Sequence, residues 1–271
     1  LLDSTDVLDR PYIRFTNLIW GDVDCEDDFN KLCNYIYPKL RRKEDPFDYD
    51  NLISYLNAIF PNEHIEKEVS IMQIGGMSNK NFKVTKGKLE YVLRVPGNGS
   101  EGMVVRSNEE QNSMQACKMG INPPIRYFNA KTGIKLADFV KNAETLNGAT
   151  IQRPSSMKKI VKIFQTLHHS HVRFGNEFNV FNEIRNYERL LEECNGTMYE
   201  GYEDHREKVL RLEDYLNKLG VSIKPCHNDL VAENFLKAEN GTIYLIDWEY
   251  SGMNDPMWDI AALFLENNFS E

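Results

Sequence analysis

The chain has 271 residues, of which 41% are hydrophobic and 11% aromatic, enough apolar material for a globular core. Its 41 acidic residues outnumber its 32 basic residues, for a formal net charge of -9. This balance argues against nucleic acid as a partner, because phosphate binding requires clustered Lys and Arg, and it suits a cationic substrate better.

The cysteine pattern and the apolar runs indicate a cellular compartment. Five cysteines are scattered along the chain without a CxxC pair, which favours reduced thiols over a disulfide framework. The first residues, LLDSTDVLDR, carry acids where a signal peptide has a basic segment, and the longest apolar run, Ile260–Leu265, is too short to span a bilayer. We therefore expect a cytoplasmic protein without membrane insertion, and the sequence indicates no oligomeric state.

Residues 1–47 differ in character from the rest and predict an N-terminal appendage. Ile13, Phe15 and Ile19 suggest a short extended piece. An acidic segment is followed by apolar residues at helical spacing, namely Phe29, Leu32, Cys33, Ile36, Tyr37 and Leu40. We interpret this as an amphipathic helix that docks on the rest of the chain. The alternative is the tail of an upstream domain, since Arg41–Pro46 reads as a linker.

Residues 48–136 predict a small β-rich lobe. A helical stripe that starts at Leu52 ends before Pro61. Three strands follow, joined by turns rich in Gly, Ser, Asn and Lys, at Val69–Ile74, Asn81–Thr85 and Tyr91–Val95. The first turn, GGMSNKN, lets backbone N–H groups approach a nucleotide phosphate closely, with Gly75, Gly76, Ser78 and Asn79 as the expected binding residues. Taken alone, the same string also fits an ordinary hairpin turn.

Arg94 lies on the third of these strands. A kinase-like small lobe needs a cation at this place to hold the nucleotide phosphates, and Arg can bind phosphate bidentately. The alternative is a strand cation that faces solvent. The helix predicted over Val104–Lys118 carries Glu109 and Glu110, either of which could pair with Arg94, and we favour Glu109.

The last two strands of the small lobe, Ile125–Phe128 and Gly133–Leu136, are expected to lead into a helix that starts at Asp138. From there, residues 137–271 predict a mainly helical lobe. Apolar spacing then predicts three helices, Ser155–His168, Phe181–Cys194 and His205–Leu219.

The string LHHSH holds the three clustered histidines, His168, His169 and His171. Their spacing could ligate a metal, but no Cys or acidic partner lies nearby in the sequence. Histidines at a helix end are common, so we favour that interpretation over a zinc site.

The stretch Pro225–Asp259 carries the chemistry. It places Asp229 and Asn234 in the pattern HxDxxxxN and Asp247 in a later IDWE. Phosphoryl transfer needs one acid to orient the acceptor hydroxyl, and a second acid with an amide oxygen to hold Mg²⁺. The turn Glu239–Thr242 predicts a hairpin that brings Asp247 close to Asn234. Each residue alone could cap a turn or form a surface pair, but their order favours an ATP- and Mg²⁺-dependent phosphotransferase.

The motifs GGMSNKNF, TLHHS, CHNDLVAENF and YLIDWEYSGMNDPMWDIAALFLE resemble those of the choline/ethanolamine kinase and aminoglycoside phosphotransferase superfamily, most closely bacterial choline kinases. The resemblance covers residues 48–271. It implies an α+β, protein-kinase-like bilobed fold, with a small antiparallel-sheet N-lobe and a mainly helical C-lobe. It also implies ATP with Mg²⁺ as donor and choline as acceptor.

The resemblance further implies roles for individual residues. Asp229 would be the catalytic base, and Asn234 and Asp247 the metal ligands. Arg94 would bind phosphate with Glu109 as its partner, and His227 would brace the catalytic loop.

The acceptor pocket needs a separate argument. The quaternary nitrogen of choline has no N–H, so recognition must come from Coulomb attraction and aromatic faces. Acids and aromatics are interleaved after Asp247, as such a pocket requires. The resemblance implies that Glu266, Tyr250 and Trp258 face the trimethylammonium group, and with the nearby acid the expected substrate-binding residues are Glu249, Tyr250, Trp258 and Glu266. For Trp258 the alternative is the buried face of a helix that begins near Pro256.

Three alternatives stay open at the level of the sequence. One is the same chemistry on ethanolamine, another small amine, an aminoglycoside or a sugar. The second is a catalytically silent kinase-like binding protein, and the third is a metal-binding protein that uses LHHSH. Members of the superfamily continue beyond the position of Glu271, so we expect a C-lobe truncated at its C-terminus and an acceptor pocket that is open on one side.

Overall fold

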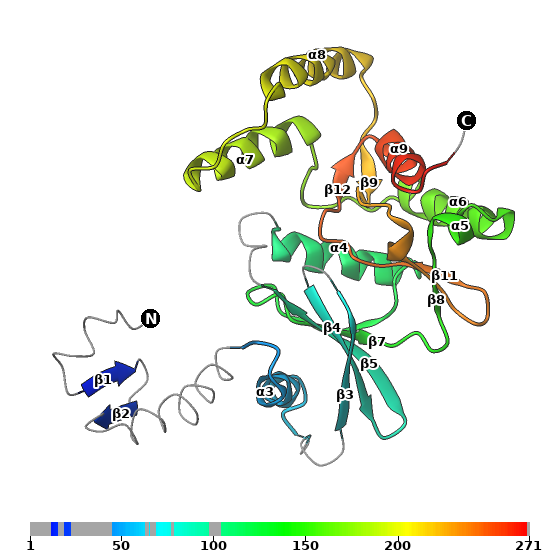
Figure 1. The fold of residues 1–271 in the computed structure, drawn as a ribbon. Helices are drawn as coiled ribbons and strands as arrows, with labels where there is room; N and C mark the ends of the chain where they lie inside the picture. Colours follow the sequence, from blue (N-terminus) through cyan, green and yellow to red (C-terminus); the bar gives the residue numbers. More distant parts are fainter. Residues whose placement is uncertain are drawn as a thin grey trace. The chain divides into compact units, whose positions relative to one another are not determined.

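The computed structural model describes residues 12–15 and 19–22 as backbone, and residues 45–62, 65, 69–76, 79–97 and 104–269 with their side chains (Figure 1). The chain divides into two compact units, Leu1–Val69 and Ser70–Glu271. The helix predicted between Phe29 and Leu40, and the predicted phosphate contact Ser78, lie outside the described residues. The domain boundaries expected after residues 47 and 136 remain predictions.

The described residues of the first unit form two strands and a helix. Strands β1 (Tyr12–Phe15) and β2 (Ile19–Asp22) pair antiparallel, which confirms the extended piece expected here. Helix α3 (Tyr49–Ile59) begins after Asp48, whose side chain accepts a hydrogen bond from the N–H of Asp50. This is ordinary N-capping, which satisfies a backbone donor that has no partner within the helix.

The N-lobe of the second unit is a five-stranded sheet with the strand order β3-β4-β5-β7-β6. Its strands are β3 (Val69–Gly75), β4 (Asn79–Lys86), β5 (Leu89–Pro96), β6 (Ile125–Phe128) and β7 (Lys135–Asp138). The pairs β4–β5, β5–β7 and β6–β7 are antiparallel. Alternate residues such as Phe82 and Val84 are buried, as one covered sheet face requires. Helix α4 (Arg106–Lys118) joins this lobe.

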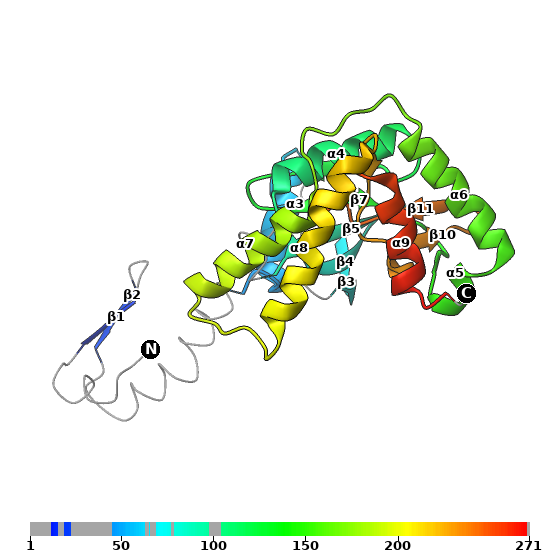
Figure 2. The ribbon, with the colours of Figure 1, turned by 90° about the horizontal axis from the view of Figure 1, so that it is seen from above.

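The C-lobe is mainly helical, and helices α7 and α8 lie side by side in it (Figure 2). Its helices are α5 (Gly148–Ile151), α6 (Pro154–His168), α7 (Val180–Glu193), α8 (Tyr202–Leu219), the 3₁₀ turn η3 (Ala232–Asn234) and α9 (Pro256–Glu266). Short strands form two small sheets, β8 (Glu144–Thr145) with β10 (Phe235–Lys237) and β11 (Ile243–Leu245), and β9 (Lys224–Cys226) with β12 (Gly252–Asn254). The expected α+β fold, with a sheet lobe and a helical lobe, is confirmed.

The core of the C-lobe surrounds the segments that carry the motifs. It includes Leu167 on α6, Leu230 and Phe235 around η3, Trp248 after β11 and Leu263 on α9. The loops near Asp229 and Asp247 are therefore anchored by fully buried side chains on both flanks. Within the described part of the chain, no helix has both the length and the apolar character needed to cross a membrane.

Several predicted boundaries were wrong. Asp138 does not begin a helix: it ends β7, where its N–H donates to the carbonyl of Pro124 and its carboxylate pairs with Arg126 on β6. The strand expected at Gly133–Leu136 begins two residues later, because Gly133 has a φ of 71° in the preceding turn. Strand β8 was not predicted at all, because it is two residues long.

Candidate active site

Asp229 lies in a loop that is held by its own neighbours. The N–H of Asp229 donates to Nδ1 of His227 at 3.3 Å, and Nε2 of His227 donates to the carbonyl of Ile246 at 2.9 Å. These partners require the tautomer with the proton on Nε2. His227 therefore connects the Asp229 loop directly to the residue before Asp247.

Asp247 is presented by an abrupt end to β11. Its φ is 66°, a left-handed conformation that a strand residue does not adopt, and β11 has already ended at Leu245. The next residue, Trp248, is fully buried and donates Nε1–H to Asn122 at 3.1 Å and to the carbonyl of Leu245 at 3.0 Å. The indole thus anchors the turn from which the Asp247 carboxylate projects.

The structure brings Asn234 and Asp247 to Asp229. The amide Nδ2 of Asn234 donates to the carbonyl and to Oδ2 of Asp229, at 2.9 and 3.0 Å, which turns Oδ1 of Asn234 away from that acid. The carbonyl of Asn234 accepts from the N–H of Ile246 at 2.9 Å, and so fixes the start of the Asp247 turn. Burial raises the pKa of Asp229, and the Asp247 charge adds to this effect.

Two orphaned polar atoms indicate where a charged ligand fits. Among the described residues, Oδ1 of Asp247 and Nε of Arg94 are the buried side-chain polar atoms without a hydrogen-bond partner. Asp247 Oδ1 lies 3.8 Å from Nη1 of Arg94. A carboxylate oxygen and an amide oxygen suit Mg²⁺, and an unpaired guanidinium N–H suits a phosphate oxygen. The residues present therefore fit a metal-bound nucleotide.

Arg94 forms the expected ion pair with Glu109. The guanidinium on β5 is bidentate to the Glu109 carboxylate on α4, with Nη2 to Oε2 at 2.9 Å. Lys135 on β7, which the sequence did not single out, reaches Oε1 of the same carboxylate at 3.1 Å. Both cations also face the ring of Phe128, at 5.4 and 5.6 Å from its centroid. One fully buried carboxylate therefore holds the Arg94 guanidinium in place.

The Glu109 cluster predicts a specific acid sensitivity. Burial opposes ionisation of Glu109, but Lys135 and Arg94 outweigh it and lower its pKa from 4.5 to about 2. Because the folded pKa is the lower one, the stabilisation is complete above pH 4.5 and is lost as the pH falls toward 2. The loss is expected to be about 3 kcal/mol. Urea unfolding of wild type and Glu109→Gln from pH 7 to pH 3 would show a converging difference of about 2 kcal/mol, because pH 3 is still above the folded pKa. Glu110→Gln is the control, and a constant difference would contradict the prediction.

The glycine turn ends at Asn79. Gly75 and Gly76 have φ values of 139° and 108°, and a Cβ at Gly76 would lie 1.8 Å from the carbonyl oxygen of Asn79. Glycine is therefore required at position 76, because the turn folds back on its own backbone. Asn79, at the start of β4, is buried.

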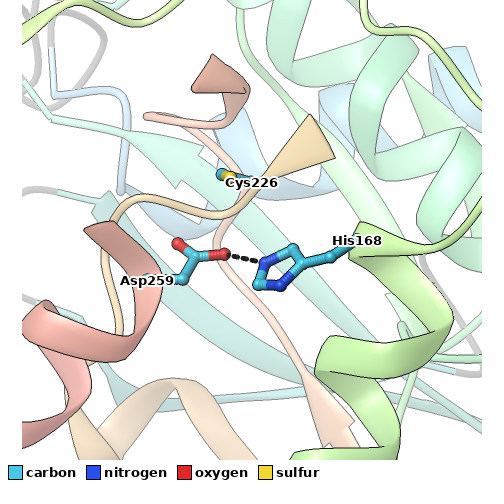
Figure 3. Close-up of side chains that lie close together, drawn as sticks. All are labelled: His168, Cys226 and Asp259. Atoms are coloured by element: carbon cyan, nitrogen blue, oxygen red, sulfur yellow. Dashed lines mark hydrogen bonds and ion pairs between the residues drawn. The ribbon is translucent and has the colours of Figure 1, made fainter. Parts of the chain in front are cut away.

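Asp259 is a buried acid whose contact with the Asp229 loop the sequence did not predict. Its fully buried carboxylate on α9 accepts from the N–H groups of Asn228 at 2.8 Å and His227 at 3.1 Å. It also accepts from Nε2 of His168 at 2.8 Å (Figure 3). The residues that precede Asp229 are thus held through their backbone by a helix 30 residues away in sequence, a link that no local pattern reveals.

His168, the first histidine of the LHHSH motif, lies in a buried cluster with Asp259 and Cys226. Possible ligand atoms of His168, Cys226 and Asp259 lie within 4.8 Å of one another, and all three residues are buried (Figure 3). The Asp259 oxygens already accept three hydrogen bonds, and burial raises the pKa of the Cys226 thiol. Because a metal needs an available carboxylate and a thiolate, the geometry favours a hydrogen-bonded brace.

The four expected acceptor residues are in different settings. Trp258 packs on Phe178 with ring centroids 5.8 Å apart and donates Nε1–H to the carbonyl of Asn228 at 3.4 Å. The carbonyl of Tyr250 accepts from Nδ2 of Asn228 at 2.9 Å, so both aromatics lie beside the Asp229 loop. Glu249 is hydrogen-bonded to Asn79 and Arg106. Glu266 ends α9 with an exposed side chain, and among the described residues no hydrogen bond or ion pair connects it to the Asp229 loop.

Comparisons with known proteins identify the family of this chain. The sequence model of the choline/ethanolamine kinase family matches residues 69–270. Protein LicA of Haemophilus influenzae is 34% identical over 209 residues, a match that covers 76% of this chain and 60% of that protein. The chain therefore spans less than two thirds of the length of that relative.

Solved structures give the same assignment. Choline kinase LicA from Streptococcus pneumoniae superposes with a TM-score of 0.72 at 38% identity, over 81% of this chain and 75% of that one. A structure of LicA in complex with AMP superposes with a TM-score of 0.71 at 40% identity, over 81% and 74%. These matches confirm the protein-kinase-like fold, and the chain belongs to the choline/ethanolamine kinase family.

Proposed function

We propose that this chain transfers the γ-phosphate of ATP to the hydroxyl group of choline and forms phosphocholine. The observation that carries the proposal is the meeting of Asp229, Asn234 and Asp247 beside the buried cation Arg94. The family to which the chain belongs supports ATP and an amino alcohol as substrates, and the LicA structures support choline and an adenine nucleotide. An ATP-dependent reaction also suits a cytoplasmic location.

Asp229 is the proposed catalytic base. Its Oδ2 accepts from Asn234, and no described residue donates to Oδ1, which leaves that oxygen for the choline hydroxyl. Burial raises its pKa, which makes the carboxylate a better proton acceptor. As the hydroxyl oxygen bonds to the γ-phosphorus, the bond to the β,γ-bridging oxygen breaks, ADP leaves and the hydroxyl proton passes to Asp229.

The donor site uses residues of both lobes. Asp247 and Oδ1 of Asn234 would hold Mg²⁺, which when bound neutralises charge on the phosphate oxygens. Arg94 would contact a phosphate through its free Nε–H, with Glu109 and Lys135 fixing its orientation. The turn from Gly75 to Asn79 would cover the phosphates with its backbone N–H groups, Ser78 included.

The acceptor site relies on aromatic faces within a negative field. Burial, followed by the charges of Glu249, Asp229 and Asp247, raises the pKa of Tyr250 to about 12. Trp258 is only half-buried, so part of its indole is available to a ligand next to Asn228. The nearby negative charges and the accessible indole face would both attract a trimethylammonium group. We retain Glu249 and Glu266 as acids that add to this field.

The test measures ADP release with a panel of acceptors. Choline is expected to stimulate turnover most, ahead of ethanolamine and an aminoglycoside, and product analysis should find phosphocholine. Trp258→Leu is expected to raise the KM for choline about tenfold while the KM for ATP stays unchanged, since a cation–π contact is lost. Turnover with ethanolamine or an aminoglycoside but not with choline would refute the acceptor assignment.

A further inference from the structure

Three side chains from separate segments close a ring of hydrogen bonds. Asn79 follows the glycine turn, Arg106 is the first residue of α4, and Glu249 lies two residues after Asp247. Nη1 of Arg106 donates to Oε2 of Glu249 at 3.0 Å, and its Nη2 donates to Oδ1 of Asn79 at 3.2 Å. Nδ2 of Asn79 donates to the same Oε2 at 3.2 Å. We call this group the Asn79–Arg106–Glu249 ring.

The ring is built to hold a fixed geometry. Its side chains are nearly buried, with 11% of Arg106 and 8% of Glu249 exposed. Charge-assisted hydrogen bonds that are shielded from water are stronger than those at a surface. Nη1 of Arg106 also donates to Oε2 of Glu109 at 2.9 Å. Glu109 also accepts hydrogen bonds from Arg94, so its carboxylate connects the ring to the cation of the proposed phosphate site.

The ring determines where the glycine turn lies. Asn79 enters the ring through its side chain, while its carbonyl oxygen lies directly under Gly76. Gly76 and the backbone of Asn79 are so close that no Cβ fits between them. A displacement of Asn79 would therefore displace the glycine turn as well. On the other side, Glu249 belongs to the turn that presents Asp247. Arg106 therefore joins the two halves of the proposed nucleotide phosphate site.

We infer that Arg106 is a positioning residue for ATP, which holds the glycine turn against the metal-binding turn through the Asn79–Arg106–Glu249 ring. A site that is already in its binding geometry loses less conformational entropy when a ligand enters, so preorganisation increases affinity. The inference rests on the proposed ATP-dependent reaction. It assigns no role to Arg106 in choline binding, and this difference makes it testable.

The experiment compares nucleotide affinity with acceptor affinity. Calorimetric titration of ATP with Mg²⁺, in the absence of choline, is expected to show binding weakened about tenfold in Arg106→Met, the effect of a lost charge-assisted hydrogen bond. The KM for ATP should rise in parallel, whereas the KM for choline should not rise, because the variant keeps the Glu249 charge and removes the cation that offsets it. Arg106→Lys should recover only part of the affinity, because a lysine does not reproduce the guanidinium fork.

Two further variants complete the design. Arg126→Met removes an exposed bidentate pair with Asp138 in the same lobe, and it should leave nucleotide affinity unchanged. Asn79→Ala opens the ring but keeps the Arg106–Glu249 ion pair, so it should fold even if Arg106→Met does not, and it should weaken ATP binding to a similar extent.

Wild-type affinity in a folded Arg106→Met and in Asn79→Ala would overturn the inference, as would an equal rise of both KM values. If wild type itself binds no ATP, the proposed function fails and this inference fails with it. If the wild type binds ATP and the variants bind it with the same affinity, only the inference about Arg106 is overturned, and the proposed function stands.

Discussion

Asp229→Asn is expected to lower kcat for phosphocholine formation by about a thousandfold, the usual scale for losing a positioned general base. Asparagine keeps the shape of the side chain, and its oxygen can still accept from Nδ2 of Asn234, so the loop should remain folded. The variant cannot take up the proton of the choline hydroxyl. Initial rates at saturating ATP and choline would measure the effect.

The matched measurement for Asp229→Asn is nucleotide binding. The affinity for ATP with Mg²⁺ should stay within about threefold of wild type, because Asp247 and Arg94 hold the donor in the proposed mechanism. Asp214→Asn, an exposed position on α8, controls for the change of one charge. Phosphocholine formation within tenfold of the wild-type rate would contradict the role of Asp229 as base.

Asp259→Asn is expected to reduce the free energy of unfolding by about 3 kcal/mol, because it leaves a buried donor unpaired. The carboxylate accepts from two backbone N–H groups and from His168. An amide presents one oxygen and one NH₂ group, so at least one N–H of the loop would face another donor. The loop that carries Asp229 would shift, and kcat should fall at least about tenfold.

Helix α9 itself offers the control for Asp259→Asn. Asp255 caps its N-terminus by accepting from the N–H of Met257 at 2.9 Å, and asparagine caps a helix equally well. Asp255→Asn should therefore change the free energy of unfolding by less than about 0.5 kcal/mol. Chemical denaturation and initial rates on both variants give the comparison. Equal stability of the two variants would show that Asp259 does not hold the loop.

Local sequence patterns predicted most elements of this protein because they depend on spacing. Runs bounded by turn residues predicted strands β3 to β6, and helical spacing predicted α6 to α9 within a few residues. Local patterns did not predict β8, which forms through pairing with β10, or the extended conformation of Asp138, which pairs with Arg126. The roles assigned to the motif residues, from Asp229 to Glu266, remain predictions until the experiments above are done.

The order of Asp229, Asn234 and Asp247 was enough to predict that they meet, because a short hairpin joins them. The ion pair between Arg94 and Glu109 could be anticipated because they lie on a strand and on the helix that follows it. Only the tertiary structure revealed Lys135 beside Glu109, the brace between Asp259 and His168, and the ring around Arg106. These contacts join residues between 26 and 170 positions apart. Local periodicity carries no information on such pairs, because chain folding determines which buried charges share a neighbour.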